Sequence, residues 1–220
     1  MNLNEQIQQL TVYALPLLFA ITLHEAAHGY AARHFGDNTA YMMGRISLNP
    51  ARHIDPVGTI LIPVLLLVLG SPFLIGYAKP VPVNFGALRN PKRDMIWVAL
   101  AGPASNFVQA FLFGLAYLLM RRFGVQEDFL LDVARAGIQV NLLLFVFNLF
   151  PIPPLDGGRV LLGLLPLRQA LALSRIEPYG FFIVMALALS GIANSIWLNP
   201  LMSISQGLLG LLLTPFRLML

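Results

Sequence analysis

The sequence predicts an α-helical protein that spans a membrane several times, and three observations support this fold class. Hydrophobic residues make up 57% of the 220 residues and charged residues only 11%, whereas soluble domains carry about a quarter charged residues. Apolar runs recur along the whole chain, several of them near the length of about 20 residues that crosses the hydrocarbon of a bilayer. The Lys and Arg residues lie mainly in short loops between these runs, where positive charge sets topology.

Composition also limits the chemistry and the partners. The chain contains no cysteine, which excludes disulfides and thiolate ligands, so any metal must be bound by His, Asp or Glu. The net charge of +4 comes from loop residues that set topology and is not a nucleic-acid-binding signal. We therefore expect the chain to contact the lipid bilayer and no nucleic acid.

The first span is expected at residues 10–35, because Gly36-Asp37 provides a C-cap and a stop. Residues 55–85 are expected to form a re-entrant hairpin that is helical on the way in. The way out is expected to be extended, because the prolines of Lys79–Val83 disfavour helix. A full crossing by residues 57–77 is the alternative. Basic clusters flank the hairpin, and re-entry leaves both on one side of the membrane, as the positive-inside rule favours.

Two further full spans are expected after the hairpin. The second span covers residues 95–119, and the third covers residues 133–150 and ends in Pro151-Ile152-Pro153-Pro154. Hydrophobic C-terminal segments follow, and the last two of them form either spans or a hairpin: a short piece up to Leu167, then residues 179–198, then residues 202–213.

The chain shows no internal repeat and no polar stretch long enough for a separate soluble domain. Residues 1–220 are therefore expected to form a single membrane-embedded domain, with a core at about 10–160 and C-terminal helices at about 161–220. Charge predicts that the N-terminus lies outside. The basic loops then lie on the cytoplasmic side, at residues 33–52, 79–93 and 159–175.

The strongest chemical signal is His24-Glu25-Ala26-Ala27-His28, late in the first span. Histidines at i and i+4 share one face of a helix, so both imidazoles can reach one metal ion. Glu25 lies beside them and is well placed to accept a proton from water activated by the metal. The alternative is a helix end with polar residues near the interface. Three ionisable groups in an apolar helix cost several kcal/mol unless they face an interior site, which favours the metal site.

A catalytic zinc site usually has three protein ligands and one open position, so a third ligand is expected. Asp156 is the best candidate. The prolines before it end the third span, and irregular backbone at membrane depth is tolerated only around protein or a water-filled cavity. Gly157 and Gly158 allow close approach of the backbone. An interfacial turn with a solvated Asp156 is the alternative.

These motifs together resemble the site-2 protease family of intramembrane zinc metalloproteases, in a compact form without PDZ or CBS domains. The resemblance begins with HEAAH on the first span and continues with the segment from Asn148 to Gly158, which ends in the LDGG sequence. Ala78–Asn84 resembles the membrane-inserted β-loop of these proteins, and Gly102–Asn106 resembles their G-x-x-x-[NSG] motif. The resemblance covers about residues 20–159.

The resemblance implies a site with one Zn²⁺ per chain, ligated by His24, His28 and Asp156. Glu25 would be the general acid/base, and Asn148 would bind substrate or stabilise the oxyanion. Substrate would be placed as an extended peptide by a further set of residues: Asn106, Val81, Pro82, Val83 and Asn84.

The expected activity is that of a metalloendopeptidase which hydrolyses peptide bonds within or near the transmembrane segments of membrane proteins. The expected location is a prokaryotic inner membrane, with the active site towards the cytoplasm. Two alternatives are a metal transporter, against which the clustering of polar residues at one depth counts, and a catalytically silent adaptor that binds membrane helices. Such silent relatives commonly lose the acid/base residue, whereas Glu25 is present.

Two residues near the motifs have open interpretations. His53 is expected to be a solvated loop residue, with a position near the site as the alternative. Asn141 lies seven residues before Asn148 on the same helix face, where it would line a cavity or form a hydrogen bond between helices.

Overall fold

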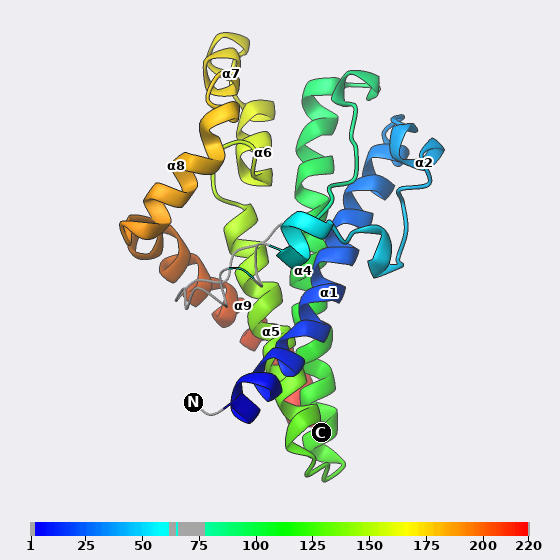
Figure 1. The fold of residues 1–220 in the computed structure, drawn as a ribbon, viewed down its shortest axis with the longest axis vertical. Coiled ribbons are helices and arrows are strands. Elements are labelled where there is room, and N and C mark those ends of the chain that lie inside the picture. The colour runs from blue at the N-terminus through cyan, green and yellow to red at the C-terminus, as the bar shows by residue number, and fades with distance from the viewer. Residues whose placement is uncertain (1–2, 62–64, 66–77, 220) are drawn as a thin grey trace.

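The computed structural model describes residues 3–61, 65 and 78–219, and all regular structure in these residues is helical. Three long helices form the centre of the fold: α1 (Leu3–His34), α4 (Pro91–Arg122) and α5 (Asp128–Asn148). Each of these helices packs against the other two, so together they form a bundle along the long axis of the molecule (Figure 1).

The remaining helices cover parts of this bundle. Helix α6 (Asp156–Leu164) packs against α4, and α9 (Asn199–Met219) packs against α4 and α5. Helices α7 (Leu167–Ser174) and α8 (Glu177–Leu189) connect α6 with α9 along one side of the molecule (Figure 1). The short helical segments are α2 (Thr39–Met42), η1 (Pro50–Arg52), η2 (Pro56–Leu61), η3 (Phe85–Ala87) and η4 (Asn194–Leu198).

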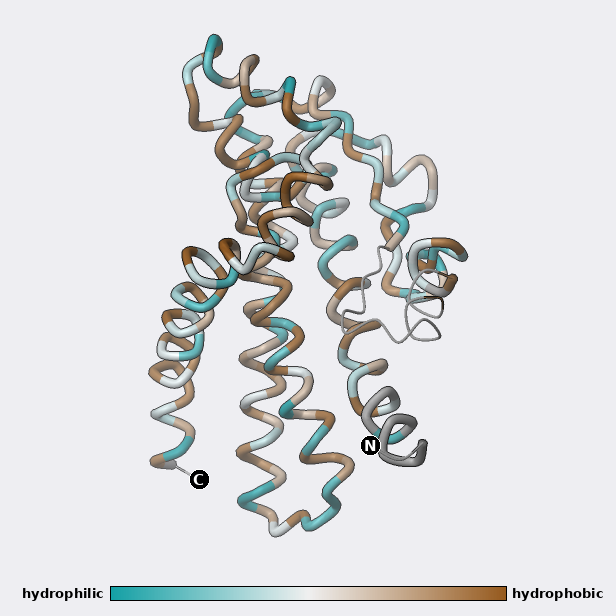
Figure 2. Tube along the Cα trace, turned by 60° about the vertical axis from the view of Figure 1, so that its left-hand side comes forward, coloured by the Kyte–Doolittle hydropathy of each residue, from teal (hydrophilic) through white to brown (hydrophobic). Residues whose placement is uncertain are grey.

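Three helical segments within the described residues are long and apolar enough to cross a membrane: α4, α5 and Asn194–Leu218. Helices α7 and α8 pass the same test only as a pair, and they are bent by 69°. Helix α1 is not among the three, and its apolar stretch includes the polar residues of the HEAAH motif. Hydrophobic residues recur along all the long helices (Figure 2), which agrees with an integral membrane protein.

The C-terminal part of the sequence prediction was wrong in one respect. Residues 179–198 were expected to be one continuous segment, but α8 ends at Leu189 and the chain turns at Gly191, which has a φ of 76°. Glycine adopts this left-handed conformation without the steric penalty that a Cβ brings. The last apolar helix therefore starts at Asn194.

The predicted re-entrant hairpin at 55–85 lies partly outside the described residues, which omit 62–64 and 66–77. Its described parts are the π-helical segment η2 and an irregular segment at residues 78–84, and no strand occurs in the described residues. Side chains hold the irregular segment. Arg45 Nη2 donates to the carbonyl oxygens of Lys79 and Pro80, and the Asp37 carboxylate accepts from the N–H of Asn84.

Candidate metal centre

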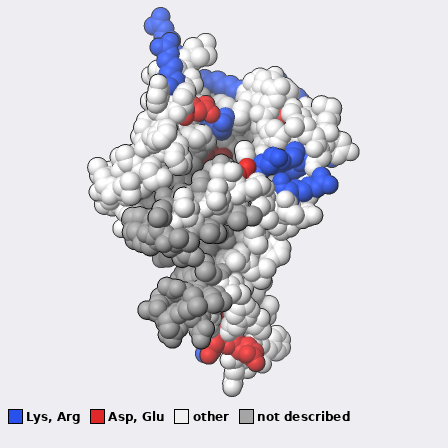
Figure 3. All heavy atoms as spheres, in the orientation of Figure 1, with Lys and Arg blue, Asp and Glu red and all other residues white. Residues whose placement is uncertain are grey.

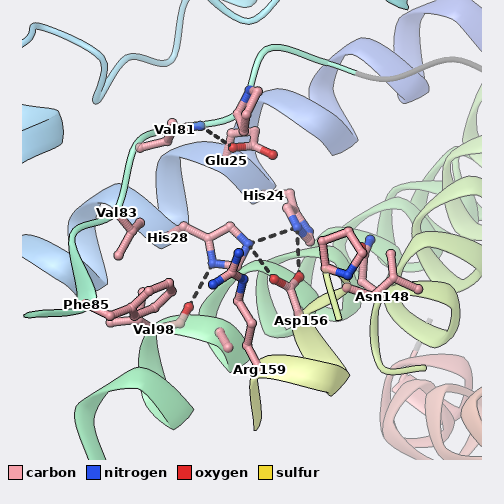
Figure 4. A pocket seen from close by; sticks show the side chains of 14 residues that line it. His24, Glu25, His28, Val81, Val83, Phe85, Val98, Asn148, Asp156 and Arg159 are labelled. Carbon is pink, nitrogen blue, oxygen red and sulfur yellow. Dashed lines mark hydrogen bonds and ion pairs between the residues drawn. The ribbon is translucent and has the colours of Figure 1, made fainter. Parts of the chain in front are cut away.

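Three side chains that are far apart in the sequence meet where α1, α4 and α6 pack together. His24 Nε2 lies 3.2 Å from Asp156 Oδ2, and His28 Nε2 lies 3.3 Å from Asp156 Oδ1. The two Nε2 atoms lie 3.0 Å apart (Figure 4). The structure therefore brings together the three metal ligands expected from the sequence, with one ligand atom of each within 4.8 Å of the others.

The outer nitrogen of each imidazole has a carbonyl acceptor, which determines the tautomer. His24 Nδ1 lies 2.6 Å from Asn106 Oδ1, and His28 Nδ1 lies 2.8 Å from the main-chain oxygen of Val98. A carbonyl oxygen cannot donate, so in each ring Nδ1 carries the proton and donates it. In its neutral form, each imidazole of this tautomer presents an unprotonated Nε2 to the centre of the site, as metal-binding histidines do.

These residues fit a zinc ion. When both imidazoles are neutral, two nitrogen lone pairs and a carboxylate face one another at about 3 Å, and such acceptors repel unless a cation lies between them. Within the described part of the chain, the buried Oδ2 atom of Asp156 has no hydrogen-bond donor, which agrees with an unprotonated His24 Nε2 beside it. Imidazole nitrogen and carboxylate oxygen are ligands that Zn²⁺ uses, and three of them leave one position open.

Helix α4 holds both histidine rings through three positions spaced one turn apart. Val98 supplies the carbonyl for His28, Asn106 supplies the amide oxygen for His24, and Gly102 lies between them. A Cβ on Gly102 would lie 2.4 Å from His28 Nε2 and 2.6 Å from His24 Nε2, closer than side-chain atoms approach. The G-x-x-x-N motif thus gives the ligand nitrogens both space and orientation.

Asn106 lies behind His24 and not in the wall of the cavity. Its side chain is fully buried, and its Nδ2 donates to the Ala20 carbonyl and to Asn141 Oδ1. Asn141 in turn donates to the Gly137 carbonyl. Every polar side-chain atom of Asn106 and Asn141 therefore has a hydrogen-bond partner. Asn141 therefore forms the hydrogen bond between helices that was one of its two expected arrangements. Asn106 was expected to place substrate, whereas the structure places its side chain against His24.

The turn between α5 and α6 positions Asp156. The prolines end α5 at Asn148, and Asp156 is the first residue of α6. A Cβ on Gly157 would lie 2.0 Å from the Leu149 carbonyl oxygen, and one on Gly158 would lie 2.1 Å from Pro153 N. The two glycines therefore allow α6 to pack directly onto the proline turn, which brings the Asp156 carboxylate to the histidines.

A cavity of about 400 Å³ opens beside the three ligands and contains the carboxylate of Glu25. Glu25 Oε2 accepts a hydrogen bond of 2.7 Å from the main-chain N–H of Val81 (Figure 4). Asn148 also lines the cavity, and its Nδ2 donates to the Leu144 carbonyl one turn earlier in α5. The cavity lining consists of His24, Glu25, His28, Pro80, Val81, Val83, Phe85, Val98, Ala99, Asn148, Pro154, Leu155, Asp156 and Arg159.

The segment expected to bind substrate is only partly in the cavity wall. Val81 and Val83 line the cavity, whereas Pro82 and Asn84 do not. Asn84 instead accepts a hydrogen bond from the N–H of Gly86 and so caps η3. Side chains of an extended segment alternate between two sides. This period would have predicted Phe85 as a third lining residue, which the sequence reasoning missed.

Two further residues lie differently from expectation or were not considered. His53 is 2% exposed, and its Nε2 donates to the Ser47 carbonyl, so the prediction of a solvated histidine was wrong. It does not line the cavity. Arg159 lines the cavity, pairs with Glu177 at 2.8 Å and lies over the ring of Phe85. Arg159 lies about one turn after Asp156 on α6, and this spacing could have predicted that both side chains face the same cavity.

The site has the chemistry of a zinc metallopeptidase within a helical membrane protein, and comparisons with known proteins agree. Residues 125–191 match the sequence profile described as Peptidase family M50. The chain is 40% identical over 181 residues to "Putative zinc metalloprotease YwhC" of Bacillus subtilis strain 168, which covers 79% of this chain and 78% of that protein. It is 30% identical over 201 residues to "Putative zinc metalloprotease Rip2" of Mycobacterium tuberculosis strain H37Rv, which covers 87% of this chain and 74% of that protein. No solved structure matches significantly.

The chain belongs to peptidase family M50, the site-2 protease family. It is an intramembrane zinc metalloprotease, and the alternatives of a transporter or a silent adaptor are not favoured.

Proposed function

We propose that His24, His28 and Asp156 hold the catalytic zinc ion and that Glu25 is the general acid/base. The observation that supports this proposal most directly is the convergence of two imidazole Nε2 atoms and one carboxylate at the edge of the cavity that contains Glu25. Glu25 follows His24 on α1, so its carboxylate lies in the cavity without belonging to the ligand cluster.

The residues of the cavity then have distinct tasks in peptide hydrolysis. When bound, zinc polarises the scissile carbonyl and lowers the pKa of water at its open coordination position. Glu25 takes a proton from the attacking water and gives it to the leaving amine, so a C–O bond forms as the C–N bond breaks. Asn148 stabilises the oxyanion with its amide, because Nδ2 has a second N–H besides the one that it donates to the Leu144 carbonyl.

Substrates are membrane proteins, and we propose that a transmembrane segment unwinds to enter the cavity. A helix hides its carbonyl groups in internal hydrogen bonds, so an extended peptide must form before attack. Val81 and Val83 lie in the cavity wall and offer main-chain groups to such a peptide, as in β-augmentation. Pro82 and Asn84 shape this wall from the other side of the segment. We also propose that residues 55–85 re-enter the membrane as a hairpin.

The proposed membrane is the prokaryotic inner membrane, with the cavity open to the cytoplasmic side. Lys and Arg lie mostly on the half of the molecule that carries α2 and α7, while the opposite end, where α4 leads into α5, shows mainly acidic residues (Figure 3). The positive-inside rule places the basic half in the cytoplasm. The whole chain, 1–220, is proposed to act as one membrane-embedded domain.

The test compares purified wild type with Glu25→Gln for bound zinc and for cleavage of transmembrane peptides in liposomes. We expect about one zinc per chain in both proteins and cleavage by wild type alone, with a loss of at least about 100-fold in the variant. Cleavage that persists in Glu25→Gln would overturn the assignment of the base. Loss of zinc in the variant would show instead that Glu25 is a ligand.

A further inference from the structure

Two prolines leave a single main-chain donor at the point where the irregular segment passes Glu25. Pro80 and Pro82 have no N–H, so Val81 carries the one N–H between residues 80 and 82. That N–H donates to Glu25 Oε2 at 2.7 Å, and both residues line the cavity. A hydrogen bond to a carboxylate is charge-assisted and is roughly twice as strong as a neutral one.

The segment is fixed at both ends by contacts that do not involve Glu25. At its start, Arg45 Nη2 donates to the carbonyl oxygens of Lys79 and Pro80 at 3.2 and 3.3 Å, and the N–H of Lys79 donates to the His53 carbonyl. At its end, the N–H of Asn84 donates to Asp37 Oδ2 at 2.7 Å. Asp37 is 1% exposed, and its other oxygen accepts from the N–H of Thr39.

The prolines stiffen the segment between these two anchors. Proline fixes its own φ near −65°, and it pushes the residue before it into the extended region. Lys79 and Val81 both precede a proline, so four consecutive residues have restricted backbones. The anchors and the prolines thus hold the Val81 N–H in one position, whether or not Glu25 accepts a hydrogen bond from it. The hydrogen bond therefore restricts the Glu25 side chain more than it restricts the segment.

Glu25 needs such a contact. Its side chain is partly exposed in a cavity of about 400 Å³ and has several rotatable bonds, which would let the carboxylate move away from the ligands. Val81 binds only one of the two carboxylate oxygens, so the other remains available for a proton. Catalytic groups work when their geometry is held within about 0.5 Å by a supporting contact.

We propose that Pro80-Val81-Pro82 is a positioning arm, whose single N–H holds Glu25 in its working orientation. This inference rests on the proposed function of Glu25 as the acid/base. It also restricts the N–H donors proposed above for the substrate, because the Val81 N–H stays with Glu25. The substrate main chain then pairs with Val83, which lies two residues further along the same wall.

The test removes the N–H without removing the segment. Val81→Pro deletes the donor at a position whose backbone is already extended, and Val81→Ala keeps the donor but loses two methyl groups from the wall. With a fluorogenic transmembrane peptide in phosphatidylethanolamine and phosphatidylglycerol liposomes, Val81→Pro is expected to lower kcat by about 10- to 100-fold at unchanged zinc content. Val81→Ala is expected to raise KM and to leave kcat within about threefold of wild type. Equal kcat values for the two variants would overturn the proposal.

A second measurement reads the hydrogen bond without any cleavage and without a backbone change. The protein is labelled with ¹⁵N-valine in nanodiscs, and the Val81 amide is assigned by its disappearance in Val81→Ala. In Glu25→Ala, loss of the carboxylate should move the Val81 amide proton upfield, whereas an unmoved resonance would overturn the proposal. If wild type shows the bond but cleaves no peptide, the proposed function fails and the positioning contact stands. If peptides are cleaved but the resonance does not move, the positioning contact alone fails.

Discussion

The two walls of the cavity are built in different ways. On the ligand wall, α1, α4 and α6 hold His24, His28 and Asp156 through buried contacts between regular helices. On the opposite wall, residues 78–84 have no regular structure and are held by contacts from side chains to main chain. The comparison indicates that helix packing positions the proposed metal ligands, whereas prolines and a few side-chain contacts position the substrate side.

The two walls differ in energetic terms because their polar groups differ in burial. His24, Asn106 and Asn141 are all buried, and a buried polar group that loses its partner costs about 1–3 kcal/mol. A change on the ligand wall therefore propagates along the hydrogen-bond chain to a ligand. On the substrate wall, the contacts of Arg45 are exposed, so water can replace some of what a substitution there removes.

The largest effect is expected from Gly102→Ala, which adds one methyl group to the ligand wall. The new Cβ would lie 2.4 Å from His28 Nε2 and 2.6 Å from His24 Nε2, so the ligand nitrogens must shift. Zinc affinity should fall by about 100-fold or more, and cleavage should fall with it. Competition with a zinc chelator, followed by elemental analysis of the protein, measures this change.

The matched control for this variant is Gly207→Ala in α9. Among the described residues, nothing lies within 4 Å of a Cβ built at Gly207. The same methyl group should therefore leave zinc affinity and cleavage as in wild type. Full zinc affinity in Gly102→Ala would mean that α4 does not pack on the histidines as the structure shows.

The next effect is expected from Asn106→Ala, which removes the acceptor for His24 Nδ1. The imidazole then loses the contact that fixes its tautomer, and Asn141 Oδ1 loses its donor as well. Loss of a supporting partner of a metal ligand typically weakens metal affinity by about 10- to 100-fold. Zinc dissociation rates, measured with a chromogenic chelator, test this expectation.

Gln109→Leu provides the comparison for Asn106→Ala. Gln109 lies almost one turn further along α4 and is 6% exposed, and neither amide atom has a hydrogen-bond partner within the described residues. Its replacement by an apolar residue of similar size should leave the zinc dissociation rate unchanged. An equal acceleration in both variants would point to general loosening of α4 and not to the His24 contact.

The ligand wall was also the part that the sequence predicted best. HEAAH places two proposed ligands on one helix face by their spacing, and Asp156 follows the proline segment that ends the third predicted span. The sequence did not reveal that Asn106 contacts a ligand, because that depends on which face of α4 packs against α1. The i, i+4 spacing of Gly102 and Asn106 equals that of His24 and His28, and this match was the available signal.

The substrate wall was predicted less well, for a physical reason. Its prolines indicated irregular, extended chain, which the structure has at residues 78–84. The contacts that hold this chain come from Arg45 and Asp37, which are distant in sequence and follow no periodic pattern. The buried position of His53 has the same origin, because its hydrogen bond to Ser47 depends on the path of a loop.

The smallest effect is expected from Asp37→Asn, on the substrate wall. The two Asp37 oxygens accept from the N–H groups of Thr39 and Asn84, and an asparagine can keep only one of these bonds. The end of the segment near Asn84 should loosen, which raises KM for a transmembrane peptide by about 3- to 10-fold. Zinc content should not change, because no ligand contacts Asp37. Asp55→Asn is the control, since within the described residues Oδ1 accepts from both Val57 and Gly58, and an amide oxygen can replace it. A KM that rises equally in both variants, or a loss of zinc in Asp37→Asn, would show that the two walls are not independent.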